Sequence, residues 1–259
     1  ISGFLYAALI ISAALISDAF FIIVVFTFSS LALYEFQKLI QYKSPVPFIL
    51  FGVIVYQFFN QNLNSYLHIS LIIACIGINF LLTYFLFKKK KINPLPLQKS
   101  GLTILYIVAS GYFIIATSSL DSSFKNGVSI SMYLLIWANN SFAYLSGKSL
   151  GKRLLFPVIS PKKTWEGFWG GALICFLISF ILIPHHPEYP YWTFPILAMI
   201  TTITSTVGDL IQSKFKRQAN VKDSGSLIPG HGGFYDRMDS VLFTAPFAYL
   251  FLMLVTYVS

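Results

Sequence analysis

The residues best suited to chemistry lie in one polar stretch, Asp209–Asp239, of an otherwise apolar chain. Carboxylates suit Mg²⁺, which takes oxygen ligands and keeps several waters. Lys and Arg bind phosphate oxygens, and glycines let a backbone approach a ligand closely. The stretch therefore predicts a site for a polyphosphate and a metal ion. Its carboxylates are Asp209, Asp223, Asp236 and Asp239, its basic residues are Lys214, Lys216, Arg217, Lys222 and Arg237, and its glycines are Gly225, Gly230, Gly232 and Gly233.

Two carboxylates in this stretch are the predicted metal ligands. Asp209 lies in TSTVGDLIQS near the end of a predicted membrane span, where an ionisable group is unfavourable without a partner. Asp236 lies just before the next predicted span, so the two could converge on one Mg²⁺ at the mouth of a helical bundle. A second cation could join it. The alternative is a solvated loop between two helices, although such a loop does not require PGHGG followed at once by alternating Asp and Arg.

A second polar stretch, Trp137–Gly171, supplies candidate substrate-binding residues. Asn139 and Asn140 interrupt an apolar segment, and polar side chains at membrane depth often face a cavity. The alternative for both is hydrogen bonding between helices. In the loop that follows, Lys162 and Lys163 could hold a triphosphate, unless they only anchor the loop at the membrane surface. Ser160 or Thr164 could cap the next helix, whose N-terminal N–H groups favour anions.

Composition indicates a multi-spanning, all-α membrane protein. The 259 residues are 56% hydrophobic and only 10% charged, with a mean hydropathy of +0.72, whereas soluble domains carry about 25% charged residues. The chain begins with Ile1 rather than Met, so we expect further residues before it. The first apolar segment lacks a small-residue cleavage site and is interpreted as a span. Both cysteines lie in apolar runs, which favours buried thiols over a disulfide.

A span needs about 20 mostly apolar residues, and the chain offers about nine such segments. The first apolar run is too long for one helix, and Ser17 and Asp18 divide it. We divide the chain into N-terminal transmembrane helices, 1–130, and a C-terminal catalytic region, 131–259. The catalytic region is predicted to have cytoplasmic loops at 148–164 and 214–239 and a polar active-site cavity that faces the cytoplasm. The predicted spans are 3–17, 19–40, 46–60, 67–87, 101–120, 128–147, 165–184, 191–213 and 240–258.

The distribution of Lys and Arg predicts the orientation. With nine spans and a cytoplasmic N-terminus, all but Lys125 of the 18 basic residues lie in cytoplasmic segments, as the positive-inside rule requires. Both charged loops then face the cytoplasm, where nucleotides are. The formal charge of +9 therefore reflects orientation and anionic ligands, and we predict no nucleic-acid partner. Lys88–Lys91 is interpreted as a topology anchor, and His185 and His186 as part of a solvated outer loop.

The Asp209–Asp239 stretch also resembles the diagnostic motif of the phosphatidate cytidylyltransferase family, also called CDP-diglyceride synthetase. SPKKTWEGFWGG is similar to the eukaryotic members, and NSFAYLSG to an upstream element of the family. The family usually carries Asp where this chain has Asn140, which brings no charge. The resemblance covers about residues 137–245. The matching motif residues are Ser213, Phe215, Lys216, Arg217, Lys222, Asp223, Gly225, Ile228, Pro229, His231, Gly232, Gly233, Phe234, Asp236, Arg237, Met238 and Asp239.

This resemblance implies that CTP and phosphatidate react to give CDP-diacylglycerol and pyrophosphate at a plasma membrane, the inner membrane in a bacterium. Mg²⁺ and basic groups would screen two anions that must meet, without a side-chain nucleophile. A homodimer is compatible with the sequence. The implied catalytic residues are Asp209, Lys216, Arg217, Lys222, Asp223, His231, Asp236, Arg237 and Asp239. The implied substrate-binding residues are Asn139, Asn140, Ser160, Lys162, Lys163, Thr164, Glu166, Ser213, Gly232 and Gly233.

Two other classes of protein remain open at this point. A CTP-dependent lipid kinase or another lipid cytidylyltransferase would use a different lipid, and a panel of lipid substrates would separate them. An ion or solute transporter would also place polar residues such as Asp209 within a span. A transporter does not need a loop rich in glycine, carboxylate and basic residues, and product formation in detergent would distinguish it from an enzyme.

Overall fold

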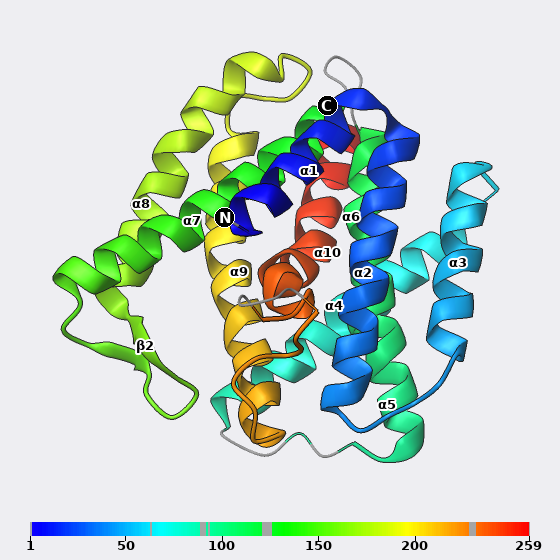
Figure 1. Ribbon diagram of the computed structural model, residues 1–259. Helices are drawn as coiled ribbons and strands as arrows, with labels where there is room; N and C mark the ends of the chain where they lie inside the picture. Colours follow the sequence, from blue (N-terminus) through cyan, green and yellow to red (C-terminus); the bar gives the residue numbers. More distant parts are fainter. Residues whose placement is uncertain are drawn as a thin grey trace.

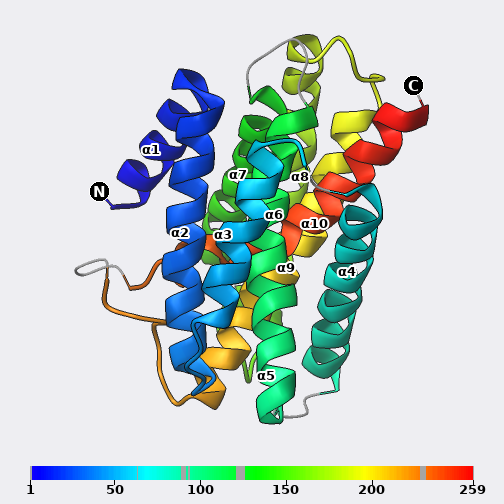
Figure 2. The same cartoon turned by 90° about the vertical axis from the view of Figure 1, so that its right-hand side faces the viewer.

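The described part of the chain forms a helical bundle with one small β-hairpin (Figures 1 and 2). The computed structural model describes residues 2–62, 64–88, 92, 94–120, 126–227 and 232–258. The helices are α1 (Ser2–Ile16), α2 (Asp18–Leu39), α3 (Val46–Phe59), α4 (Ser65–Phe87), α5 (Pro96–Leu102), η1 (Thr103–Val108), α6 (Ala109–Ala116), η2 (Thr117–Leu120), α7 (Gly127–Leu150), α8 (Trp165–Leu182), η3 (Ile183–His185), α9 (Thr193–Gln218) and α10 (Tyr235–Val258). The strands β1 (Leu154–Phe156) and β2 (Ser160–Thr164) pair antiparallel between α7 and α8.

Each of the nine predicted spans coincides with helical structure in the described part of the chain. Six of these segments are long and apolar enough to cross a membrane, which fits a multi-pass membrane protein. They are Asp18–Leu39, Ser65–Phe87, Leu97–Leu120, Trp165–His185, Thr193–Gln218 and Tyr235–Tyr257. The helices α1 and α3 are apolar but shorter, and α7 contains polar Asn139 and Asn140. Nine spans therefore stay a prediction.

Side-chain caps fix several helix boundaries. Ser17 separates α1 from α2, as predicted, because its hydroxyl accepts a hydrogen bond from Phe20 N at 3.0 Å. At the start of α8, Thr164 accepts from Gly167 N at 3.1 Å. Such caps satisfy backbone N–H groups that a helix N-terminus leaves without partners. Thr164 is also the last residue of β2, so this cap joins the hairpin directly to the start of α8.

The two polar loops differ from the sequence-based expectation. The fold is largely α-helical, as predicted, but the predicted loop 148–164 contains the β1–β2 hairpin, in which Leu154 lies opposite Thr164. The second loop is shorter than the predicted 214–239, because α9 continues to Gln218 and α10 begins at Tyr235. Basic residues in the last turn of α9 and Asp236 in the first turn of α10 complement the helix dipoles. Helix formation therefore extends beyond the apolar segments.

The C-terminal helix α10 runs through the middle of the bundle, with α9 beside it and α7 and α8 beyond (Figure 1). Close packing of α9 and α10 depends on Gly208, since a Cβ there would lie 2.6 Å from Phe243 Cβ and 2.9 Å from Asp239 O. An aromatic cluster joins α2 to the facing ends of α9 and α10, with ring centroids 5.1 Å apart for Phe36–Phe215 and 5.4 Å apart for Phe36–Tyr235. These contacts hold both ends of the predicted motif against the N-terminal half of the chain.

Candidate active site

One cavity of about 330 Å³ brings together residues from both predicted polar stretches, including Asp209, Asp236 and Lys163. Its wall is built by α7, the hairpin, the start of α8, α9 and the start of α10. The volume lies within the range of small-molecule sites, about 300–1,000 Å³. Its polar lining consists of Asn140, Tyr144, Ser160, Lys162, Lys163, Thr164, Thr206, Asp209, Asp236, Asp239 and Ser240.

Asp209 projects from α9 into this cavity and meets the hairpin there. Lys163 Nζ lies 2.7 Å from Asp209 Oδ2, and Ser213 Oγ donates to Asp209 Oδ1 at 3.2 Å. The side chains of Lys163 and Asp209 are 25% and 33% exposed, so water reaches the pair. A ligand can therefore approach this carboxylate and lysine.

Asp236 is more enclosed and is held by several donors. Its Oδ1 accepts from Lys216 Nζ at 2.6 Å and from Gln212 Nε2 at 2.8 Å. Its Oδ2 accepts from Ser224 N and Gly233 N at 2.8 and 3.0 Å and lies 2.9 Å from Ser224 Oγ. This carboxylate therefore ties the α9–α10 loop to both helices. Gly232 has a φ of +83° beside it, and a Cβ there would come within 2.9 Å of Asp236 Oδ2.

The deepest polar residues connect α7 to α9 and α10. Asn140 Nδ2 donates to Ser240 Oγ at 3.1 Å and lines the cavity. Buried Asn139 does not line it; its Nδ2 donates to Ser205 Oγ at 2.9 Å. Asp239, also buried, accepts from Ser240 N at 2.6 Å. Both asparagine amides therefore form hydrogen bonds between helices, and only Asn140 also faces the cavity.

Four of the predicted residues in β2 lie in the cavity wall. Ser160, Lys162, Lys163 and Thr164 all line it. Glu166 instead accepts from Lys152 N at 3.0 Å and from Arg153 N at 3.1 Å, outside the cavity. Glu166, which was predicted to bind substrate, therefore holds the start of α8 against the backbone just before β1.

Several other motif residues lie away from the cavity wall. Arg217 is exposed and donates to Val221 O at 3.4 Å, and Lys222 and Asp223 are also exposed. Arg237 is half-buried in the first turn of α10. The predictions for Ile228, Pro229, Gly230 and His231 lie outside the described residues.

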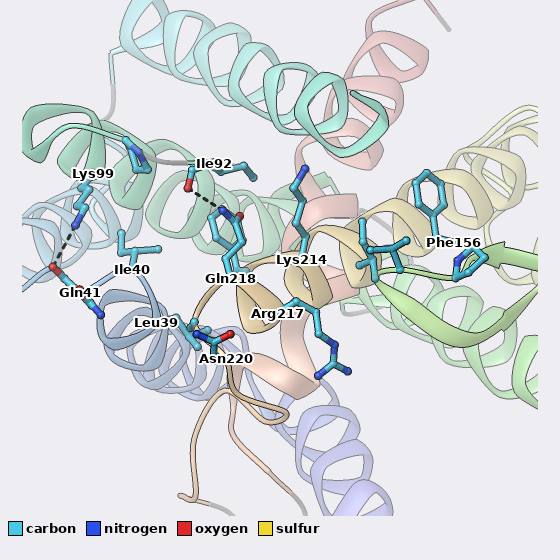
Figure 3. Close-up of a pocket in the computed structure, with 16 residues that line it drawn as sticks. Leu39, Ile40, Gln41, Ile92, Lys99, Phe156, Lys214, Arg217, Gln218 and Asn220 are labelled. Atoms are coloured by element: carbon cyan, nitrogen blue, oxygen red, sulfur yellow. Dashed lines mark hydrogen bonds between the residues drawn. The ribbon is translucent and has the colours of Figure 1, made fainter. Parts of the chain in front are cut away.

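A larger cavity of about 690 Å³ lies beside the end of α9 and contains Lys99, Lys214 and Arg217 (Figure 3). These cations do not converge. Lys99 donates to Gln41 O, Lys214 donates to Phe85 O, and Arg217 points away from Lys214. The cations that the structure describes here therefore do not share an anion site, and the smaller cavity is the better candidate.

Sequence reasoning missed three residues that support the site. Glu35 of α2 is buried and accepts from Ser224 Oγ at 2.8 Å and from Tyr235 N at 2.9 Å. Gln212 and Ser224 both donate to Asp236. A signal for Glu35 existed, because an ionisable residue inside an apolar span is unfavourable without a partner.

The cavity lining fits a magnesium ion that is shared with a substrate. Within the described residues, no group of three or more His, Cys, Asp or Glu side chains could hold a metal ion alone. Mg²⁺ is commonly held by one or two carboxylates together with substrate phosphates and waters. Asp209 meets this requirement, whereas Asp236 would have to exchange part of its hydrogen bonding with Lys216 or Gln212.

Fold and site together define a multi-pass helical membrane protein with a polar, phosphate-compatible cavity between α7, the hairpin, α8, α9 and α10. The model of the cytidylyltransferase family matches residues 1–255. A phosphatidate cytidylyltransferase from Bacillus subtilis is 33% identical over 266 residues, covering 98% of this chain and 96% of the relative. A protein of the same name from Staphylococcus haemolyticus is 35% identical over 70% of this chain and 68% of its own. One from Haemophilus influenzae is 43% identical over 48% of this chain and 45% of its own. The chain therefore belongs to the cytidylyltransferase family.

Proposed function

We propose that this protein is a phosphatidate cytidylyltransferase, which converts CTP and phosphatidate to CDP-diacylglycerol and pyrophosphate. The observation that carries the proposal is the cavity in which Asp209, Asp236 and Asp239 face Lys162 and Lys163. The family match over residues 1–255 and the similarity to the Bacillus subtilis protein over nearly the whole chain support it.

In the proposed reaction, a phosphatidate oxygen attacks the α-phosphorus of CTP, the new P–O bond forms, and pyrophosphate leaves. Both reactants are anions, so catalysis depends on positioning and charge neutralisation. Lys162 and Lys163 project from the hairpin as cations for the triphosphate. Lys216, beside Asp236, supplies a third cation. The phosphate nucleophile is already ionised near neutral pH, so no general base is needed.

Asp209 and Asp236 are the proposed ligands of Mg²⁺, with Asp239 in the same cavity. The ion would neutralise charge on the phosphate oxygens in the transition state. Without the ion, Lys163 pairs with Asp209 and Lys216 pairs with Asp236. If Mg²⁺ binds these carboxylates instead, both lysines become available to bind substrate phosphates. Asn140 lowers the negative charge of the site relative to an Asp at the same position.

The proposal places the cavity at the cytoplasmic surface, in an inner membrane if the organism is bacterial like the relatives. Lipid tails would stay in the bilayer while the headgroup enters the cavity. Cysteine labelling of intact cells should modify a probe at Glu188 but not one at exposed Ser226 in the α9–α10 loop. Labelling of Ser226 from outside would refute this orientation. A homodimer also stays a prediction.

The function is tested with purified protein in detergent, CTP, phosphatidate and Mg²⁺, by measuring pyrophosphate and the lipid product. We expect both products in equal amounts, and EDTA should stop their formation until Mg²⁺ is restored. A panel containing diacylglycerol and a polyprenol should show that phosphatidate is the preferred lipid. Preference for another lipid, or no product at all, would refute the proposal.

A further inference from the structure

Glu35 carries a carboxyl group near the C-terminal end of the apolar helix α2, far in sequence from the motif. Its side chain in α2 is only 1% exposed. A buried carboxylate is unfavourable unless donors compensate it. Among the described residues, its donors are Ser224 of the α9–α10 loop and Tyr235, the first residue of α10. The α9–α10 loop runs beside α2 in Figure 2.

The first contact fixes the start of α10. Glu35 Oε2 accepts from Tyr235 N at 2.9 Å. Tyr235 is the first residue of α10, where helical N–H groups have no partner within the helix. A carboxylate from another helix therefore acts as the cap, and it also suits the positive end of the helix dipole.

The second contact leads to Asp236. Ser224 Oγ lies 2.8 Å from Glu35 Oε2 and 2.9 Å from Asp236 Oδ2, and Ser224 N donates to the same Asp236 oxygen at 2.8 Å. Ser224 thus bridges Glu35 of α2 and Asp236 of α10, because its one hydroxyl hydrogen can be donated to Glu35 while its N–H is donated to Asp236. Through this bridge and the Tyr235 contact, Glu35 defines where the Asp236 carboxylate lies.

Two motif glycines are explained by the same carboxylate. A Cβ at Gly225 would lie 2.3 Å from Glu35 Oε1, and one at Gly233 would lie 2.1 Å from Glu35 Oε2. A Cβ at either position would therefore have to displace the Glu35 carboxylate, and at Gly233 also the Ser224 hydroxyl, from the arrangement seen here. The loop backbone is therefore shaped to enclose this carboxyl group.

We propose that Glu35 is a positioning residue for cytidylyl transfer, holding Ser224 and the start of α10 so that Asp236 faces the cavity. The inference rests on the proposed function. Glu35 itself lies outside the cavity lining and acts through Asp236. Residues that orient a metal ligand typically change affinity or activity by about 10–100-fold when they are altered.

The test compares Glu35→Gln with wild type and with Glu188→Gln, a matched change in the α8–α9 loop. The measurements are kcat, KM for each substrate, the Mg²⁺ concentration for half-maximal rate, thermal stability, and hydrogen exchange at Tyr235 N without substrates. In Glu35→Gln we expect kcat to fall about 10–100-fold, the Mg²⁺ requirement to rise, and exchange at Tyr235 N to accelerate. KM for phosphatidate should change little, and Glu188→Gln should resemble wild type.

A wild-type kcat and Mg²⁺ requirement in folded Glu35→Gln would overturn the inference. Lower stability with unchanged kcat per folded molecule would also overturn it, since that is the result of a purely structural role. If Glu35→Gln does not fold, Ser224→Ala decides, because it removes the bridge and leaves the Tyr235 contact; an unchanged kcat there would refute the positioning role. A wild-type protein without cytidylyltransferase activity would instead refute the proposed function, while exchange at Tyr235 N still reports on the contact.

Discussion

Replacing Asp209 by Asn should separate catalysis from folding. The carboxylate pairs with Lys163 at 2.7 Å, but the two side chains are 33% and 25% exposed. Pairs that water can reach contribute about 0–1 kcal/mol to stability. Loss of the charge should therefore lower the unfolding free energy by at most about 1 kcal/mol and the melting temperature by about 2–4 °C.

The effect on turnover should be much larger. Removal of one preorganised electrostatic group typically reduces kcat by about 100–1,000-fold, which corresponds to about 2.7–4 kcal/mol. Pyrophosphate release by Asp209→Asn should thus fall at least about 100-fold, with near-normal thermal stability. Asp236→Asn should lower both quantities, because Asp236 also accepts hydrogen bonds from Lys216, Gln212 and the loop backbone. Wild-type turnover in Asp209→Asn would refute the assignment of this residue to the site.

Three further predictions concern neighbouring groups. Lys216→Gln should reduce kcat/KM more than Arg217→Ala, because Lys216 forms an ion pair with Asp236, whereas Arg217 is exposed outside the 330 Å³ cavity. Equal effects of the two changes in steady-state kinetics would contradict this geometry. Asn140→Asp should keep the fold and lower the Mg²⁺ concentration for half-maximal rate, and an unchanged titration curve would show that position 140 does not tune the metal site. His186 was interpreted as lying in a solvated loop, but its side chain is buried. Burial lowers its pKa below the usual 6.5, so as the pH falls toward and below 6.5 the unfolded chain binds more protons than the folded chain, and stability declines. His186→Gln should lessen this decline in melting curves between about pH 7 and pH 5, and an identical decline would contradict it.

The sequence by itself determined the helices and the chemistry of the motif. The nine apolar runs bounded by polar residues each coincide with helical structure in the described part of the chain. They could be found in the sequence because a membrane span must be long and apolar. Ser17 marked the break between α1 and α2, since a hydroxyl there can cap a helix. Likewise, the types and spacing of Asp209, Asp236 and the surrounding basic residues are sufficient to indicate phosphate chemistry.

Only the tertiary structure decided which of these residues meet. Helical periodicity does not specify how helices pack, so Lys163 and Asp209 became partners only when α9 packed beside the hairpin. The hairpin was missed because its pairing depends on contacts between short strands rather than on a strong local pattern. Arg217 and Glu166 have the right chemistry but face elsewhere. Glu35 shows the same limit most clearly, because its partners lie about 190–200 residues away in sequence, and no local pattern encodes a contact that the packing of α2 against α10 creates.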